Sequence, residues 1–480
     1  MTTVDISPPE RQAAQLVELS RRRPILIALG LASVIAALMQ TLVLPLLPRF
    51  PAWLDISPAA AGWIATSTML IGAISAPIVG WLGDRFGYKR MIVLLLLLLA
   101  AGSAISALSN SLGPMLIGRT LQGCATGIVG LAIAILREGW DMRSLPISVG
   151  FLSGTIGIGT SLGVPLSGVI VMSLPWQAVF WISGAGALLA LVAIVILVPA
   201  SPTRSHRPFD LTGALGLSAA LFLFLLPLSG AGPIGVGSAA GWGCLCAAFV
   251  LGVLWVRHEM RCSHPLVDPR VMLRAPVRAS HMIALLLGLG FFLSFTGTIT
   301  IVQTAAFAGA GLGGSVFLTG MVQLPASLLS IAAPPLAGVV TLRLGARAAV
   351  AAGILAALLA FGARALVLDH AVAIAASAMF VSGGISFAFA ALPNILLSAT
   401  PRSQTGSANG VNMLFRQVGA ATASVMGVAI LASTGGPIER LGPIPFYWLF
   451  GLGAVSCVLA LIVLLFIPRP SAATLSEQML

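Results

Sequence analysis

Charged residues are scarce in this sequence. Only 8% of its 480 residues are Asp, Glu, Lys or Arg, whereas 58% are hydrophobic and the mean hydropathy is +1.05. A soluble domain is about half apolar and about a quarter charged, so this composition excludes a water-soluble protein and indicates a polytopic membrane protein. The net charge of +12 therefore reflects loops beside a membrane and does not indicate a nucleic-acid partner.

Cysteine, histidine and acidic residues are few as well. The five cysteines form no CxxC pair and the five histidines are scattered, so we expect no disulfide framework, no metal site and no cofactor. An integral membrane enzyme, such as a lipid transferase, would need paired carboxylates or His/Asp sets at the membrane face, and none is visible. None of the 13 acidic residues falls near the middle of an apolar segment, which argues against a carboxylate at mid-depth in the membrane.

Long apolar runs make up most of the chain. A membrane-spanning helix needs about 20 mostly apolar residues, and the runs show no alternation of apolar and polar residues typical of strands. Cutting the chain at charges, prolines and polar clusters therefore predicts fourteen helical spans. Their predicted bounds are 25–46, 60–82, 91–109, 114–136, 147–172, 178–199, 211–230, 236–257, 279–304, 313–338, 348–367, 371–397, 406–432 and 445–467.

Basic residues fall on alternate loops between these spans. With the N-terminus in the cytoplasm, about twenty of the 25 Lys and Arg residues lie on the cytoplasmic side. This bias predicts an even number of spans with both termini cytoplasmic. The first apolar run follows Arg21–Arg23 and is too long for a signal peptide, so we predict an uncleaved first span.

The most charged short stretch, GWLGDRFGYKR at residues 80–90, lies between the second and third spans. Its glycines permit a tight reversal of the chain. Arg85, Lys89 and Arg90 fit the role of positive anchors on the cytoplasmic side, but that role leaves Asp84 unexplained.

This stretch resembles the helix 2–3 loop signature of the major facilitator superfamily. The positions that match the signature are Gly80, Leu82, Asp84, Arg85, Gly87, Lys89 and Arg90. The resemblance implies a conformational latch, in which Asp84 lies near the N-terminus of a helix from the other half, around residues 403–406, because a helix N-terminus favours an anion. It also implies a charge relay to Glu138, although Tyr88 stands where many members carry a basic residue.

Further motifs extend the resemblance over most of the chain. RTLQGCATG keeps the family residues Arg119, Gln122 and Gly123, and GIGTSLGVPLSG resembles the exporter signature of the fifth helix. FDLTGALGL and EMRCSHPLVDPRVML resemble the sequences that flank the extra helix pair of fourteen-helix drug:proton antiporters. The exporter signature is kept at Gly159, Gly163, Pro165 and Gly168, where small residues favour close helix packing.

The resemblance implies an all-α integral membrane protein with the major facilitator fold. We predict a six-helix bundle at 1–200, an inserted two-helix linker with cytoplasmic flanks at 201–278, and a second bundle at 279–480. We expect the inserted pair not to line the cavity. PLAGVVTLRLGAR at 335–347 is a degenerate copy of residues 77–89 in which Leu342 replaces the Asp, so the latch should be asymmetric.

Polar residues within the spans are candidates for the transport pathway. Arginine at the bilayer centre costs roughly 2.5 to 3.5 kcal/mol, so such residues should face protein or water. Arg119 shares a face with Gln122 and either faces the cavity or bonds to carbonyl groups of the first helix. Arg416 lies on a polar stripe with Asn409 and Asn412. The remaining polar candidates are Gln40, Gln303, Gln323 and Asn394, with Phe291, Phe295 and Phe387 as apolar surface.

We therefore expect a secondary exporter of small lipophilic compounds in a bacterial plasma (inner) membrane, working by alternating access. The resemblance implies proton-coupled antiport, but Met39 stands where relatives carry an acid in the first helix. Either the substrate is then neutral, lipophilic or anionic, or proton coupling uses a peripheral acid such as Glu138. The expected partners are the substrate, protons and the lipid bilayer, and we expect a monomer. A dedicated exporter of one anionic metabolite or lipid is the alternative.

Overall fold

The computed structural model describes residues 8–141, 144–200, 210–228, 234–235, 237–263, 265, 267–306, 309–314, 316–401, 404–432 and 442–467. Fourteen helices in these ranges are long and apolar enough to cross a membrane, as predicted. The prediction of an all-α membrane protein is confirmed.

The first part of the chain supplies six spans. Its elements are α1 (Pro8–Thr41), η1 (Leu44–Arg49), α2 (Phe50–Leu54), α3 (Pro58–Phe86), α4 (Tyr88–Ala107), α5 (Leu112–Gly123), η2 (Cys124–Gly127), α6 (Ile128–Gly139), α7 (Leu145–Ser173) and α8 (Ala178–Leu197). The middle part contains α9 (Leu211–Leu228), α10 (Ala239–Arg261) and the short α11 (Pro269–Met272). The last part contains α12 (Ala275–Gln303), α13 (Val316–Leu344), α14 (Ala346–Leu366), α15 (Ala371–Ala399), α16 (Thr405–Ala432) and α17 (Pro443–Leu465).

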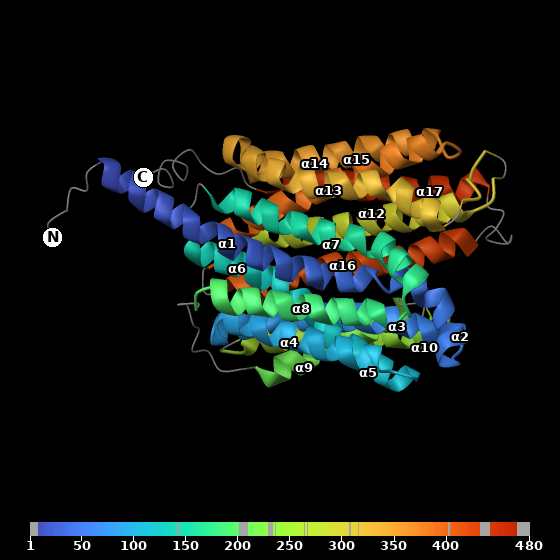
Figure 1. Cartoon of the computed structure of the whole chain (residues 1–480), viewed down its shortest axis with the longest axis horizontal. Coiled ribbons are helices and arrows are strands. Elements are labelled where there is room, and N and C mark those ends of the chain that lie inside the picture. The colour runs from blue at the N-terminus through green and yellow to red at the C-terminus, as the bar shows by residue number, and fades with distance from the viewer. Residues whose placement is uncertain are drawn as a thin grey trace.

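The long helices run lengthwise through the molecule, with α14 and α15 along one side and α4, α5 and α9 along the other (Figure 1). Helices α1, α3, α4 and α6–α8 contribute to one hydrophobic core, and α12–α17 share another. The two groups meet mainly where α7 packs on α13 and where α3 packs on α16. The division of the chain into units 1–200, 201–278 and 279–480 stays a prediction.

Two predicted spans contain 3-10 segments that the sequence did not indicate. The first ends at Thr41 instead of residue 46, because LPLLPR continues as the 3-10 helix η1, and proline cannot donate the hydrogen bonds that would extend an α-helix. The fourth is interrupted by the 3-10 turn η2 between α5 and α6, where the Thr126 hydroxyl donates to the Gly123 carbonyl at 2.8 Å.

The predicted internal repeat is visible in the backbone. Gly87 joins α3 to α4 with φ +96°, and Gly345 joins α13 to α14 with φ +85°. Residues with a Cβ atom rarely adopt these positive φ angles, so both junctions depend on glycine. The same sharp connection thus occurs once in each half.

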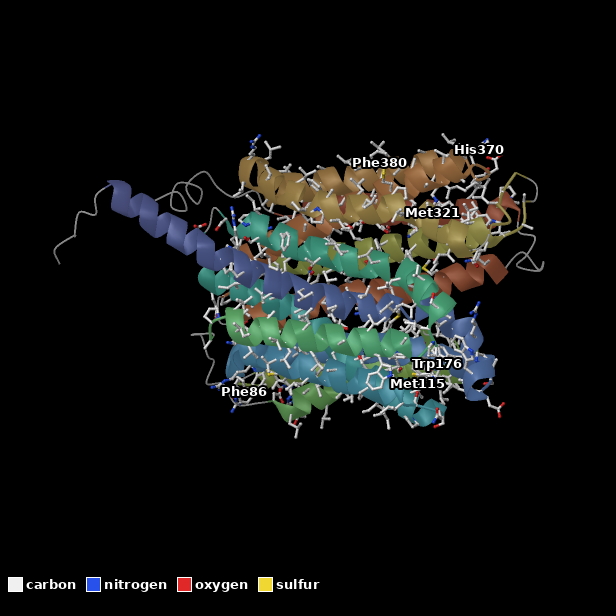
Figure 2. The ribbon with its side chains drawn as sticks, viewed as in Figure 1. Phe86, Met115, Trp176, Met321, His370 and Phe380 are labelled. Atoms are coloured by element: carbon white, nitrogen blue, oxygen red, sulfur yellow. The ribbon has the colours of Figure 1, made fainter. Side chains whose placement is uncertain are left out.

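The two ends of the bundle are distinct. Figure 2 shows Phe86, at the C-terminus of α3, at one end, and Trp176 and His370 at the opposite end. We call the first of these the latch end. Between them, large apolar side chains such as Leu189 and Phe249 lie exposed on the outer helices. A surface of this kind suits lipid and not water.

The inserted helices differ from each other in their contacts. Helix α9 packs against α3 and α16, whereas α10 packs mainly on α9 and is otherwise exposed. Asp210 accepts a hydrogen bond from the Gly213 N–H at 2.8 Å and lies 3.0 Å from His258 Nε2, so it both caps α9 and holds α10 to it. Asp210, His258 and Cys262 bring possible metal-ligand atoms within 4.8 Å of one another, a grouping that the sequence spacing did not indicate.

Candidate functional site

Asp84 connects the two halves of the molecule at the latch end. Its Oδ1 accepts a hydrogen bond from the Gly406 N–H at 2.9 Å, and its Oδ2 accepts one from the Ser407 N–H at 3.1 Å. These groups belong to the first turn of α16, where backbone N–H groups lack partners within the helix. The carboxylate is buried, so both bonds are shielded from water. Asp84 therefore lies beside the helix start that the family signature implied.

Tyr88 is the other partner of Asp84. Its hydroxyl donates to Asp84 Oδ1 at 2.8 Å, and the side chain is fully buried. The phenol thus occupies the position at which a basic residue was expected, and it holds the carboxylate in place without neutralising it. Tyr88 opens α4 directly after Gly87, so the sharp junction brings its hydroxyl back to Asp84.

Glycines allow the backbones of α3 and α16 to touch beside Asp84. A Cβ atom on Gly80 would collide with the backbone of Gly406 and Ser407, and one on Gly410 would collide with the backbone of Ala76. The match of Gly80 to the family signature thus has a steric reason. Side chains at these positions would separate the two helices.

Arg137, near the C-terminus of α6, forms a second connection between the halves. Its Nη2 donates to the carbonyl groups of Leu397 at 2.6 Å and Thr400 at 2.8 Å, and its Nη1 donates to the Thr405 hydroxyl at 2.5 Å. A cation is favourable at a helix C-terminus, and the two carbonyls lie at the end of α15. From the sequence, Arg137 is one of the basic residues assigned to the cytoplasmic side and has no further role. Asp84 and Arg137 thus hold the two helix ends of one α15–α16 turn, and we call this arrangement the latch.

The other signature residues surround this contact. Gly87 forms the α3–α4 junction, Arg85 lies over the Trp81 and Phe86 rings, and Lys89 donates to the Val195 carbonyl at 2.9 Å. Arg90 is exposed, and Glu138 follows Arg137 at the end of α6. The charge relay to Glu138 stays a prediction.

A cavity of about 440 Å³ lies between the two halves. It extends from Arg416, midway along α16, to Leu44 and Leu47 of η1. Its walls come from α1, α3, α6, α7, α9, α12 and α16, and they include Phe291, Phe292, Phe295, Met69 and Met413. No carboxylate occurs among the lining residues that the structure describes. The cavity is thus mainly apolar, as suits a lipophilic ligand.

A few polar groups interrupt the apolar wall. Gln40 Nε2 donates to the Thr126 hydroxyl at 3.3 Å, and the Arg416 guanidinium lies 4.2 Å from the centre of the Phe389 ring. Gln417, which was not among the candidates from the sequence, also lines the cavity. Of the polar residues that the sequence suggested for the transport pathway, Gln40 and Arg416 therefore line the main cavity.

Arg119 lies outside the cavity. It is fully buried, donates to the carbonyl groups of Ile64 at 3.0 Å and Met39 at 3.3 Å, and donates to Gln122 Oε1 at 2.7 Å. Gln122 in turn donates to the Ser103 hydroxyl at 2.8 Å. Of the two alternatives for Arg119, bonding to carbonyls of the first helix is the one observed, and the pair joins α1, α3, α4 and α5.

Three further polar candidates also lie away from the cavity lining. Gln303 is exposed and donates to the Thr319 hydroxyl at 3.3 Å, while Asn394 contacts carbonyl groups of its own helix. Gln323 lies on α13 and is partly buried. Phe387 packs against the core of the α12–α17 group and does not line the cavity.

The exporter signature packs α7 against α1. A Cβ on Gly159 would collide with Val34 and Ala37, and one on Gly163 would collide with Thr41. Pro165 lies inside α7, and nothing lies within 4 Å of a Cβ placed on Gly168. The first two glycines therefore serve close packing, while the structure gives no such reason for Gly168.

Helix α9 forms part of the cavity wall. Leu225 and Leu228 line it, packed beside Leu70 of α3 and Leu414 of α16. The expectation that neither inserted helix lines the cavity is therefore wrong for α9. The sequence did not distinguish the cavity-facing side of α9, because the sides that face the cavity, α10 and lipid are all apolar.

We expect a cysteine at Leu225 or Leu228 to be protected by a transported compound. In a variant without native cysteines, N-ethylmaleimide should label Leu228→Cys several times more slowly when the compound is present, because the ligand covers the thiol. Phe249→Cys on α10 is the matched control, since its side chain is 74% exposed on the outer surface. Equal protection at both positions would contradict a wall role for α9.

Two groups of helices around a central cavity are an architecture typical of membrane transporters. A family profile described as Major Facilitator Superfamily matches residues 29–324, and the chain belongs to this family. It is therefore a multi-pass membrane transporter of small molecules and not an enzyme.

Known relatives include exporters. The chain is 29% identical to a tetracenomycin C resistance and export protein of Streptomyces glaucescens, over 86% of this chain and 76% of that protein. It is also 29% identical to a triacylglyceride transporter of Mycolicibacterium hassiacum, over 76% and 70% of the two chains. A solved proton:xylose symporter shares the fold with a TM-score of 0.65 at 15% identity, covering 94% of this chain and 97% of that one.

Proposed function

We propose that this transporter exports small lipophilic compounds across a bacterial plasma membrane by alternating access coupled to proton antiport. The observation that carries the proposal is the mainly apolar cavity of about 440 Å³ between the two halves, which has aromatic walls and no lining carboxylate among the described residues. An apolar ligand gains from burial in such a cavity, whereas a dication would lack a counter-charge there. One bacterial relative is named for export of tetracenomycin C and the other for transport of triacylglycerides, and the second name supports a lipophilic substrate.

In this proposal, closing and releasing the latch switches the cavity between its two openings. Asp84 and Arg137 close the latch end around the α15–α16 turn, while the cavity extends toward the opposite end. With the basic loops in the cytoplasm, this arrangement is the state closed to the cytoplasm. Release of the latch would open the cavity to the cytoplasm for the next compound.

Transport by inverted membrane vesicles tests the proposal. With and without a pH gradient, we compare uptake of a dication, a monocation, a neutral amphiphile and an organic anion, all lipophilic. We expect uptake of the neutral amphiphile or the anion, stimulated severalfold by the gradient, and little uptake of the dication. Strong gradient-driven uptake of the dication would overturn the proposed substrate class.

The same vesicles test proton coupling. Glu138→Gln should lower the gradient-driven component if protons move through the acid at the end of α6, while facilitated exchange of the compound down its own gradient should persist. Equal stimulation by the gradient in both proteins would exclude Glu138 as the coupling residue.

A further inference from the structure

Arg416 is a cation on the cavity wall that has no anionic partner among the described residues. It projects from the middle of α16, and within the described ranges its guanidinium contacts the Phe389 ring at 4.2 Å and forms no hydrogen bond or ion pair. A guanidinium carries five N–H donors, and an aromatic face satisfies none of them as an oxygen would. Such a charge in an apolar setting is costly unless an anion or water reaches it. By contrast, the buried Arg119 and Arg364 are held by oxygen acceptors of the protein.

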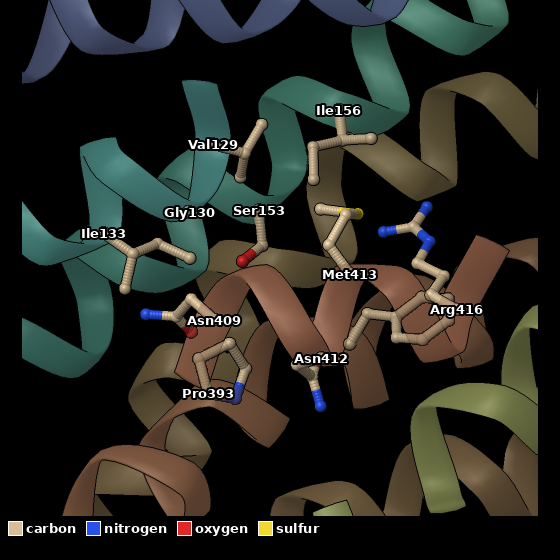
Figure 3. A pocket seen from close by; sticks show the side chains of 11 residues that line it. Val129, Gly130, Ile133, Ser153, Ile156, Pro393, Asn409, Asn412, Met413 and Arg416 are labelled. Atoms are coloured by element: carbon tan, nitrogen blue, oxygen red, sulfur yellow. The ribbon is translucent and has the colours of Figure 1, made fainter. Parts of the chain in front are cut away.

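A narrow pocket of about 40 Å³ continues from the main cavity toward the latch end. Arg416, Met413, Val129 and Ile156 line both spaces, so Arg416 stands at their junction. Figure 3 shows Asn409 and Met413 on the side of α16 that faces Ser153 and Ile156 of α7. This pocket is large enough for only a few atoms or water molecules.

Asn409 offers an unused hydrogen-bond donor to a ligand oxygen in the narrow pocket. Its Nδ2 is buried and has no hydrogen-bond partner among the residues that the structure describes, and the side chain is 5% exposed. Asn412 is different, because its amide already donates to the Ser280 carbonyl at 3.2 Å. No acid lines the narrow pocket in the described chain, so the groups around it offer donors without a competing negative charge. An unpaired buried donor costs free energy that an oxygen of a ligand or water would recover.

We propose that the preferred compounds are amphiphiles with one acidic group, a carboxylate or an acidic hydroxyl, which binds Arg416 at this junction while the apolar body fills the main cavity. The proposal rests on the export function inferred above and specifies the charge of its substrate. Arg416 binds the acidic oxygens directly, and Asn409 binds a second oxygen or the water that accompanies them. The narrow pocket is too small for an aromatic ring, so only the acidic group of the compound enters it. The apolar part of the compound stays in the main cavity among Phe291, Phe292 and Phe295.

Binding of three size-matched probes to the purified full-length protein tests this inference. The radiolabelled probes are 2-naphthoic acid, its neutral methyl ester and a naphthyl trimethylammonium cation, measured by scintillation proximity at neutral pH. We expect the acid to bind at least tenfold more tightly than the ester, and the cation to bind most weakly. Arg416→Gln should weaken acid binding at least tenfold and change ester binding less than threefold, whereas Arg416→Lys should keep part of the preference.

Gln417→Ala is the matched control, because Gln417 lines the same cavity without a charge and should affect the acid and the ester alike. Asn409→Ala should weaken binding of the acid more than that of the ester. Equal affinity for acid and ester in the wild-type protein, or equal weakening of both by Arg416→Gln, would overturn the anion site and leave the proposed export of lipophilic compounds standing. If none of the three probes binds, the lipophilic cavity function fails together with this inference.

Discussion

Replacement of Asp84 by alanine should reduce transport at least tenfold without reducing the amount of folded protein. The change removes two charge-assisted hydrogen bonds to the start of α16 and leaves the Gly406 and Ser407 N–H groups buried without their acceptor. Each such loss costs about 1 to 3 kcal/mol, and the lost interaction with the helix dipole adds up to about 2 kcal/mol. Because a shift of a few kcal/mol moves a two-state equilibrium by a factor of a hundred or more, the latch-closed state should become rare.

Asp84→Asn should fall between wild type and alanine, because the amide keeps one acceptor oxygen but loses the charge. Distances between spin labels at Phe86→Cys and Ser398→Cys would report opening of the latch end, since these side chains are exposed on opposite halves. Wild-type transport by Asp84→Ala would exclude the latch role.

Asp141 offers a matched control for Asp84. It lies outside the spans near the same end, and hydrogen bonds from Ser144 and then from Arg22 lower the pKa of its carboxyl to about 2. It is therefore also charged at neutral pH, but its partners belong to the same half of the molecule. Asp141→Asn should leave transport within about twofold of wild type, because the pair is exposed and such pairs contribute little.

Arg137→Met should impair transport about as strongly as Asp84→Ala. Methionine fills a similar length of the side chain but donates no hydrogen bonds, so the carbonyl groups of Leu397 and Thr400 and the Thr405 hydroxyl lose their cationic partner. Hydrogen bonds to a charged group contribute about 1.5 to 3 kcal/mol each, and these connect one half of the molecule to the other. Export of a lipophilic compound and the spin-label distance across the latch end are the two measurements.

Arg274→Met separates this role from a general effect on the end of α15. Arg274 donates to the Ala399 carbonyl at 3.1 Å, next to the carbonyls that Arg137 binds, but it precedes α12 of the same half. Its loss should change transport less than threefold. If Arg274→Met and Arg137→Met reduced transport equally, the hydrogen bonds of Arg137 would serve to cap the C-terminus of α15 and not to join the two halves.

Most of the fold could be predicted from the sequence because the signals were local. Fourteen apolar runs of sufficient length predicted fourteen spans. The resemblance of residues 80–90 to the family signature implied where Asp84 would lie. The glycine junction at Gly345 followed from its likeness to residues 77–89. The differences arose where proline stopped α1 early and where η2 interrupted the fourth span, since neither changes the hydropathy.

The cavity was harder to predict, for a geometric reason. Spacing along a helix indicates which residues share a face, but not which neighbouring helix that face meets. Arg119 and Gln122 do share a face, yet that face meets α1, α3 and α4, and not the cavity. Arg137 was missed for a similar reason, because a positive anchor beside a loop and a cation that binds a distant helix end have the same sequence pattern.

The backbone contact of Gly80 with Gly406 has a consequence for how such a protein diversifies. The two groups of helices meet there through main-chain atoms and through Asp84, and none of these residues lines the cavity. Substitutions that reshape the cavity can therefore accumulate without disturbing this contact. Substrate preference can thus diverge within a lineage while the proposed latch is inherited unchanged.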